Sequence, residues 1–175
     1  MSINWEDNAE LCEQLGKLFE RWKPLVNNGT KVLMWDYKEK ESIAVIYRFV
    51  VGKDLDDQVF TIYVGAGDNL SGKGGRTSLV YQYRSGNRKG GIRREIEAEV
   101  EKFEKRGYTA WTEIIELHEG LETKMSVIES LAIAKHWLEY IRRLREETEI
   151  PRFLNKEIKE LHEIPDLVRR LGFVE

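Results

Sequence analysis

The sequence IAVIYRFVV at residues 43–51, together with VFTIYVG at residues 59–65, decides the fold of this chain. β-Branched and aromatic side chains dominate both runs, which is typical of β-strands. The link at residues 52–58 is short and mostly polar. This combination predicts two strands that pair antiparallel across a hairpin.

The spacing of apolar residues predicts the other elements around this hairpin. In chain order, they are a helix over 5–22, a strand or extended segment over 31–37, a brief helix from Thr77 or Ser78 to Arg84, a helix over 92–105, a strand over 108–117, a helix over 123–147, and two short helices within 153–161 and 165–171. The predicted fold is α/β (α+β): a three-stranded antiparallel sheet flanked by helices, with an N-terminal helix and a C-terminal helical extension.

The predicted helix over 123–147 is the longest element. Its apolar residues recur at steps of three and four and predict a continuous buried stripe, made of Val127, Leu131, Ala134, Leu138 and Ile141. His136 does not belong to this stripe, and the pattern predicts that it lies on the surface.

The length and composition predict one soluble globular domain. The chain has 175 residues, of which 41% are hydrophobic and 34% are charged. We expect an N-terminal segment at 1–40, the main domain at 41–150 and a helical tail at 151–175. No apolar run approaches the roughly 18 residues of a membrane span. Because Cys12 is the only cysteine, it cannot form an intrachain disulfide or a cysteine zinc site, so we predict a cytoplasmic protein.

The charge of the chain is unevenly distributed. The net charge is −3, but residues 73–94 contain seven basic residues and no acidic one. The other 21 basic residues are outnumbered by all 31 acidic residues. A basic patch on an acidic body is the electrostatic pattern of a protein that binds phosphates locally, although many charged runs are only solvated surface. The residues expected to contact phosphates are Lys73, Arg88, Lys89, Arg93 and Arg94.

The two strand runs carry a resemblance to the GIY-YIG nuclease family. Val45-Ile46-Tyr47 stands where that family has Gly-Ile-Tyr, and Tyr63-Val64-Gly65 stands where it has Tyr-Ile-Gly. The resemblance covers roughly residues 43 to 141. It implies a Mg²⁺- or Mn²⁺-dependent endonuclease that hydrolyses phosphodiester bonds in DNA. It also implies that Tyr47 and Tyr63 line the active site.

The same resemblance implies an arginine and a second phenol or imidazole on the following helix. Tyr83 occupies the position of the family's general base, and either Tyr83 or Tyr47 is expected to take the proton of the attacking water. The expected arginine position is occupied by Leu79. Arg76, seven residues before Tyr83, or the adjacent Arg84 is therefore expected to stabilise the charge on the phosphate.

The family's metal ligand is a glutamate on the helix after the third strand. Glu139 has Lys135, Arg142 and Arg143 three or four positions away, which is typical of a salt-bridged surface residue. Glu129 has no such counter-charge on its own helix, and a carboxylate among apolar neighbours is typical of a functional site. We therefore predict that Glu129 binds the metal ion.

Two alternatives to a nuclease remain open. The turn from Gly67 to Lys73 matches the spacing of a phosphate-binding P-loop and directly follows a strand, although Gly74 replaces the Mg²⁺-binding hydroxyl. The chain would then bind nucleotides. The displaced arginine is also compatible with a DNA-binding module that keeps the fold without cleavage. The sequence does not determine the oligomeric state.

Overall fold

A four-stranded antiparallel sheet in the order β1-β6-β4-β5 forms the centre of the computed structural model. The structure describes residues 16–53, 58–72, 75–118, 120–147 and 149–156. The strands of this sheet are β1 (Lys23–Pro24), β4 (Val45–Gly52), β5 (Val59–Gly67) and β6 (Thr109–Glu116). The predicted α/β class and the antiparallel pairing are confirmed. The sheet has four strands instead of three because β1 pairs with β6.

The strand β4 pairs with β5 on one side and with β6 on the other. Tyr47 lies opposite Gly65 of β5 and Ile114 of β6. Because successive side chains of a strand point to opposite faces, Tyr47 and Arg48 lie on opposite sides of the sheet. This alternation separates an aromatic face from a face that carries buried charge.

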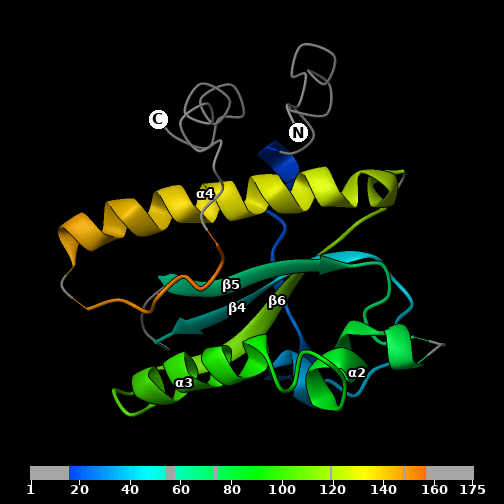
Figure 1. The fold of residues 1–175 in the computed structure, drawn as a ribbon, viewed down its shortest axis with the longest axis horizontal. Coiled ribbons are helices and arrows are strands. Elements are labelled where there is room, and N and C mark those ends of the chain that lie inside the picture. Colours follow the sequence, from blue (N-terminus) through cyan, green and yellow to red (C-terminus); the bar gives the residue numbers. More distant parts are fainter. Residues whose placement is uncertain (1–15, 54–57, 73–74, 119, 148, 157–175) are drawn as a thin grey trace.

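The helices cover both faces of the sheet (Figure 1). The helices α2 (Leu79–Arg84) and α3 (Ile92–Glu104) lie on the face of Tyr47, and α4 (Met125–Glu146) lies on the other face. In α3, Ile96, Val100 and Phe103 are buried, and Ile92 at its start is partly buried. In the described ranges no helix is both long and apolar enough to cross a membrane.

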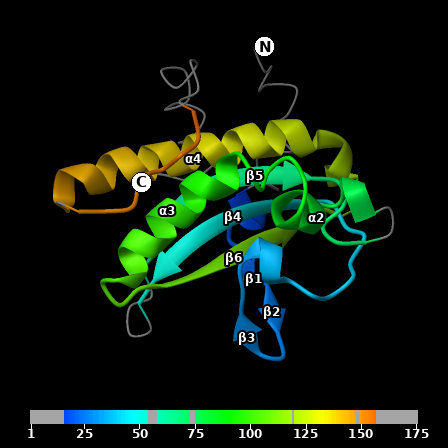
Figure 2. The same ribbon diagram turned by 60° about the horizontal axis from the view of Figure 1, so that its bottom comes forward.

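In the described part of the predicted helix over 5–22, the helical conformation ends before Trp22. Most of the predicted helix lies outside the described residues; residues 16–18 are helical, but Trp22 is not. The chain then enters β1 and a small hairpin of β2 (Val26–Asn27) and β3 (Thr30–Lys31), which projects from the sheet in Figure 2. Its Asn28-Gly29 turn has positive φ angles of 49° and 80°, the backbone of a two-residue hairpin turn.

The segment over 31–37 continues from this hairpin. After β3 it forms a single 3₁₀ turn, η2 (Met34–Asp36), with Met34 and Trp35 buried. The backbone N–H of Met34 donates to the hydroxyl of Thr112 at 2.8 Å. The segment is thus attached to β6 rather than added to the sheet as a full strand.

The outer edge of β5, the last strand of the sheet, is covered by the residues that follow α4. The N–H of Leu154 donates to the carbonyl of Ile62 at 2.8 Å. The Asn155 side chain bonds both backbone groups of Val64, each at 2.8 Å. The predicted helix from Phe153 is therefore wrong within the described residues, because this segment instead satisfies the backbone of an edge strand. The rest of that helix and the one over 165–171 lie outside the described residues.

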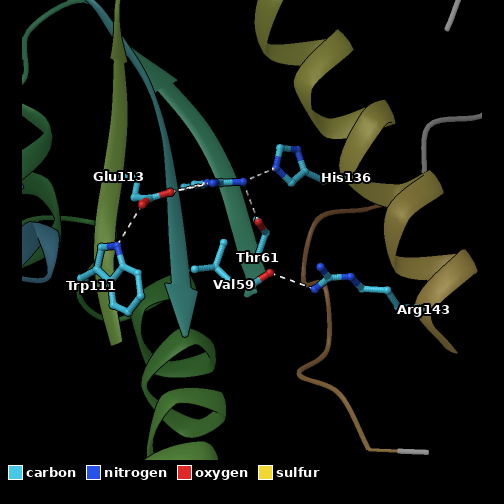
Figure 3. A network of polar contacts seen from close by, with 7 residues as sticks. Val59, Thr61, Trp111, Glu113, His136 and Arg143 are labelled. Atoms are coloured by element: carbon cyan, nitrogen blue, oxygen red, sulfur yellow. Dashed lines mark hydrogen bonds and ion pairs between the residues drawn. The ribbon is translucent and has the colours of Figure 1, made fainter. Parts of the chain in front are cut away.

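A buried polar network connects the sheet to α4. Arg48 forms an ion pair with Glu113, with Nη2 and Oε1 2.6 Å apart, and its Nη1 lies 3.2 Å from Nε2 of His136. Figure 3 shows Glu113 on one side of this network and His136 on the other. Nδ1 of His136 lies 2.6 Å from the carbonyl of Ala132, so Nδ1 carries the proton and Nε2 accepts from Arg48.

The predicted surface position of His136 is wrong, since its side chain is only 3% exposed. The predicted stripe of α4 is also rotated, because Leu131 and Ala134 are buried whereas Ile141 is 38% exposed. Both errors have one cause. The inward face of α4 contains a polar residue that the charged partner Arg48 satisfies from the sheet.

We expect His136 to make the stability of this protein depend on pH. Burial, together with the charge of Arg48, lowers the pKa of His136 to about 3. In the unfolded chain this histidine takes up a proton near pH 6.5, whereas in the folded protein it stays neutral down to about pH 3. The free energy of unfolding is therefore highest above pH 6.5 and decreases as the pH falls toward 3. Urea unfolding at pH 7.5 and pH 5 should show the stability gap between wild type and His136→Gln narrowing by about 2 kcal/mol. A gap that is equal at both pH values would contradict this assignment.

Candidate active site

Three of the predicted active-site residues meet near the edge of β5. The phenol oxygens of Tyr47 on β4 and Tyr83 on α2 are 2.7 Å apart, and both side chains are fully buried. The ring of Tyr63 on β5 lies 6.4 Å from that of Tyr47. Tyr63 is the partly exposed phenol of the three. The structure thus brings the three tyrosines together, and their catalytic role stays a prediction.

Gly65 makes room for this arrangement. A Cβ atom at this position would lie 2.2 Å from the Tyr47 phenol oxygen, which is far inside van der Waals contact. Tyr47 and Gly65 are cross-strand partners, so the ring of Tyr47 passes over the backbone of β5. The glycine in Tyr63-Val64-Gly65 therefore allows the Tyr47 phenol to reach the edge of the sheet.

Arg88 is the arginine that contacts these tyrosines. It lies in the turn between α2 and α3, and its Nη1 donates to the Tyr47 oxygen at 3.1 Å. Its guanidinium lies over the ring of Tyr83, 5.5 Å from the centroid. Burial alone would lower the pKa of Arg88, but the neighbouring phenols of Tyr47, Tyr83 and Tyr63 raise it above its usual value, so Arg88 stays charged.

The two arginines predicted for this role lie elsewhere. The guanidinium of Arg84 donates to the backbone carbonyls of Trp35 at 2.8 Å and Tyr37 at 2.7 Å, which fixes the segment before β4. Arg76 is exposed in the 3₁₀ turn η3 (Gly75–Thr77), before α2 begins. We therefore replace both with Arg88, which had been predicted only as a phosphate-contacting residue.

Glu129 completes the group from the other side of β5. It lies on the first turns of α4 and is partly buried. Burial raises its pKa, and the charge of Arg88 partly offsets this rise. Glu129 also influences the pKa of Tyr63. We call Tyr47, Tyr63, Tyr83, Arg88 and Glu129 the edge cluster.

Glu139, the competing glutamate, lies away from the edge cluster. It lines a small hollow of about 20 Å³ that it shares with His136 and Arg143 on the same helix. This hollow also includes Thr61 of β5. The two glutamates thus occupy different surroundings, and the choice of Glu129 remains a prediction about function.

The phenols of the edge cluster are neutral at physiological pH. Burial raises the pKa of Tyr47, Tyr63 and Tyr83, and for Tyr47 and Tyr83 the rise is large. Tyr83 is fully buried and bonded to Tyr47, so its phenol does not contact solvent. Tyr47 is as buried as Tyr83, so its phenol does not contact solvent either. The expectation that Tyr83 or Tyr47 takes the proton of the attacking water is therefore corrected: both phenols are held against Arg88 and away from solvent.

The other predicted phosphate contacts fall into three groups. Lys89 and Arg94 follow Arg88 of the edge cluster in the sequence. Both are exposed, so they remain available to a phosphate. Arg93 is instead packed into the fold, because it donates to the Tyr83 carbonyl at 2.9 Å and lies 4.4 Å from the centroid of Trp35. Lys73 lies outside the described residues.

Three of the described amides in the P-loop-like turn, those of Leu70, Ser71 and Gly72, are bonded within the protein. The N–H of Leu70 donates to the carbonyl of Ile43, and that of Ser71 donates to the carbonyl of Glu41, both at 3.0 Å. The N–H of Gly72 donates to the Asn69 side chain at 2.8 Å. A P-loop binds phosphates through such N–H groups, which here are occupied by the protein.

Glu129 can supply one oxygen ligand to a metal ion. Among the described residues, no group of three or more histidine, cysteine, aspartate or glutamate side chains is placed to hold a metal. Mg²⁺ is commonly bound by one or two carboxylates, substrate phosphates and several waters. A single partly buried carboxylate, Glu129, fits this kind of site.

Comparison with known proteins adds no relative. No protein-family model, curated protein or solved structure gives a significant match to this chain.

Proposed function

We propose that this protein is a Mg²⁺-dependent DNA endonuclease that hydrolyses phosphodiester bonds at the edge cluster. The observation that carries the proposal is the contact of one guanidinium, Arg88, with a buried pair of phenols, Tyr47 and Tyr83. These groups come from β4, α2 and the turn after α2, so three separate segments supply one small site. Such convergence of charged and phenolic groups is typical of an active site.

The proposed roles follow from exposure and charge. Tyr63, the partly exposed phenol, hydrogen-bonds to the attacking water and orients it toward the phosphorus. Arg88 stabilises the negative charge that develops on the phosphate oxygens. Tyr47 and Tyr83 hold Arg88 in place from the buried side. The water oxygen forms a new bond to phosphorus and loses a proton to solvent. The bond between phosphorus and the leaving sugar oxygen breaks, and that oxygen takes up a proton from solvent.

Glu129 is the proposed ligand for Mg²⁺ or Mn²⁺. When bound, the metal ion supplies Lewis-acid stabilisation of a phosphate oxygen. The charge of Arg88 lowers the pKa of Glu129 and so favours the ionised carboxylate that a metal ion requires. Lys89 and Arg94 would contact neighbouring phosphates of the backbone.

Nicking of supercoiled plasmid DNA in Mg²⁺ and in EDTA tests this proposal. Wild type should nick only with the metal, and Tyr63→Phe should reduce the rate by about 10²-fold, because it removes the hydroxyl that orients the water. Tyr81→Phe is the matched control, since Tyr81 is exposed on α2. Its rate should equal that of wild type.

Two outcomes would oppose the proposal. DNA binding without nicking under any metal would favour a binding module of the same fold. Equal nicking rates for wild type and Tyr63→Phe would remove Tyr63 from the chemistry.

A further inference from the structure

Gln82 on α2 connects η3, which precedes this helix, to the turn that follows it and carries Arg88. Its Oε1 accepts a hydrogen bond from Nε of Arg88 at 2.8 Å, and its Nε2 donates to the carbonyl of Thr77 at 3.1 Å. One end of the amide faces a donor and the other faces an acceptor. The Gln82 side chain therefore has only one orientation that satisfies both partners.

The backbone of Gln82 holds the same turn. Its carbonyl accepts from the N–H groups of Arg88 at 3.1 Å and Lys89 at 3.2 Å. The turn folds back closely on α2, since a Cβ atom on Gly86 would lie 2.9 Å from the Cα of Gln82. This folding returns Arg88 to the tyrosines although it lies four residues beyond the end of α2.

The guanidinium of Arg88 is thus held at two of its nitrogens. Nε is bonded to Gln82, and Nη1 is bonded to Tyr47. Two bonds to different nitrogens of a planar fork fix both its position and the direction of its plane. A guanidinium fixed in this way is preorganised for a phosphate oxygen, so it needs no reorientation during the reaction.

We infer that Gln82 is a positioning residue, which acts on the phosphate through Arg88. This inference rests on the proposed function, because it assigns Gln82 a part in the same phosphodiester chemistry. Gln82 has no contact of its own with the substrate in this scheme. Its amide sets the orientation of the guanidinium while leaving its charge unchanged.

Gln82→Met tests the inference, because methionine preserves length and shape without the amide. The rate constant kcat for plasmid nicking should fall about 10- to 100-fold, as expected when a reacting group is slightly misplaced. The KM for DNA should change less than twofold, since the charge of Arg88 remains. Gln58→Met is the matched control, because Gln58 is exposed and lies outside the edge cluster.

A second variant separates orientation from charge. Gln82→Glu keeps an acceptor beside Nε of Arg88 but adds a negative charge that neutralises the guanidinium. The slope of log K for DNA binding against log salt should then fall by about 0.9, the value for one phosphate contact. In Gln82→Met the slope should stay at its wild-type value.

A double-mutant cycle distinguishes positioning from a general structural role. Lysine in place of Arg88 has no Nε–H fork for Gln82 to orient. Gln82→Met should therefore reduce kcat less than twofold in the Arg88→Lys background. An equal loss in both backgrounds, or full kcat in Gln82→Met alone, would overturn the inference.

Nuclear magnetic resonance separates this inference from the proposed function. The ¹⁵N-detected Nε–H signal of Arg88, assigned by its loss in Arg88→Lys, should shift in Gln82→Met and not in Gln58→Met. If wild type nicks no DNA but the signal shifts, the nuclease function fails and the contact with Arg88 stands. If wild type nicks DNA and the signal does not shift, the nuclease function stands and the role of Gln82 fails.

Discussion

Replacement of Glu129 by glutamine is expected to abolish Mg²⁺-dependent nicking, with a loss of at least about 10³-fold. The amide has the shape of the carboxylate but lacks the negative charge that holds a hard cation. Binding of DNA should change little, because the basic residues are untouched. Plasmid nicking at saturating DNA and a fluorescence titration over a range of DNA concentrations measure these two effects separately.

Glu139→Gln is the matched control for this prediction. Glu139 lies on the same helix but lines a separate hollow with His136 and Arg143, so its loss should leave the nicking rate near that of wild type. The reverse pattern would move the metal site along α4. Full activity in both variants would remove a glutamate ligand from the mechanism.

The raised pKa of Glu129 adds a pH dependence to the same prediction. Burial favours the protonated carboxyl, and a protonated carboxyl does not bind Mg²⁺. As the pH falls, protons should displace the metal at a higher pH than for an ordinary glutamate. The Mg²⁺ concentration needed for half-maximal nicking should therefore rise in mildly acidic buffer.

Replacement of Arg88 by lysine is expected to lower kcat by about 10² to 10³-fold. Lysine keeps the charge but loses the planar fork that bonds Gln82 and Tyr47 at the same time. The salt dependence of DNA binding should be preserved, because one positive charge remains. Single-turnover nicking measures the chemical step without interference from product release.

Arg84→Lys is the contrasting variant. Arg84 bonds the carbonyls of Trp35 and Tyr37, so its replacement should lower the free energy of unfolding and leave kcat unchanged. Arg76→Lys should affect neither quantity, since Arg76 is exposed in η3. A large loss of kcat in Arg84→Lys with a normal rate in Arg88→Lys would restore the arginine expected from the sequence.

The tyrosines of the edge cluster could be predicted because strand periodicity is regular. Tyr47 and Tyr63 lie near the same place on paired strands, and the pairing follows from the two apolar runs. Tyr83 follows a serine cap: the Ser78 hydroxyl accepts from the N–H of Tyr81 at 3.2 Å, which starts α2 where expected. Local rules were sufficient to place these elements, whereas the family resemblance singled out the three tyrosines on them.

The arginine could not be predicted from helical spacing. The seven-residue spacing between Arg76 and Tyr83 would put both residues on one face only if a single helix contained them. In the structure α2 begins at Leu79, after Arg76. Arg88 reaches the site through a turn after α2, and the turn depends on tertiary bonds to Gln82. Such a return of the chain has no periodic pattern in the sequence.

The remaining errors share a different cause. His136 and Asn155 are polar residues that are buried because distant partners satisfy them: Arg48 in one case and the backbone of Val64 in the other. Patterns of apolar residues do not register such pairs.

The closure of β5 by Asn155 has a consequence for synthesis on the ribosome. Val64 and Asn155 are 91 positions apart, so β5 emerges long before the segment that covers its edge. All residues of the edge cluster are present in the growing chain while Ile62 and Val64 still have unpaired backbone groups. During that interval the strand can pair with other chains. The covering of the β5 edge therefore waits until the chain has been synthesised past Asn155, after all residues of the edge cluster have appeared.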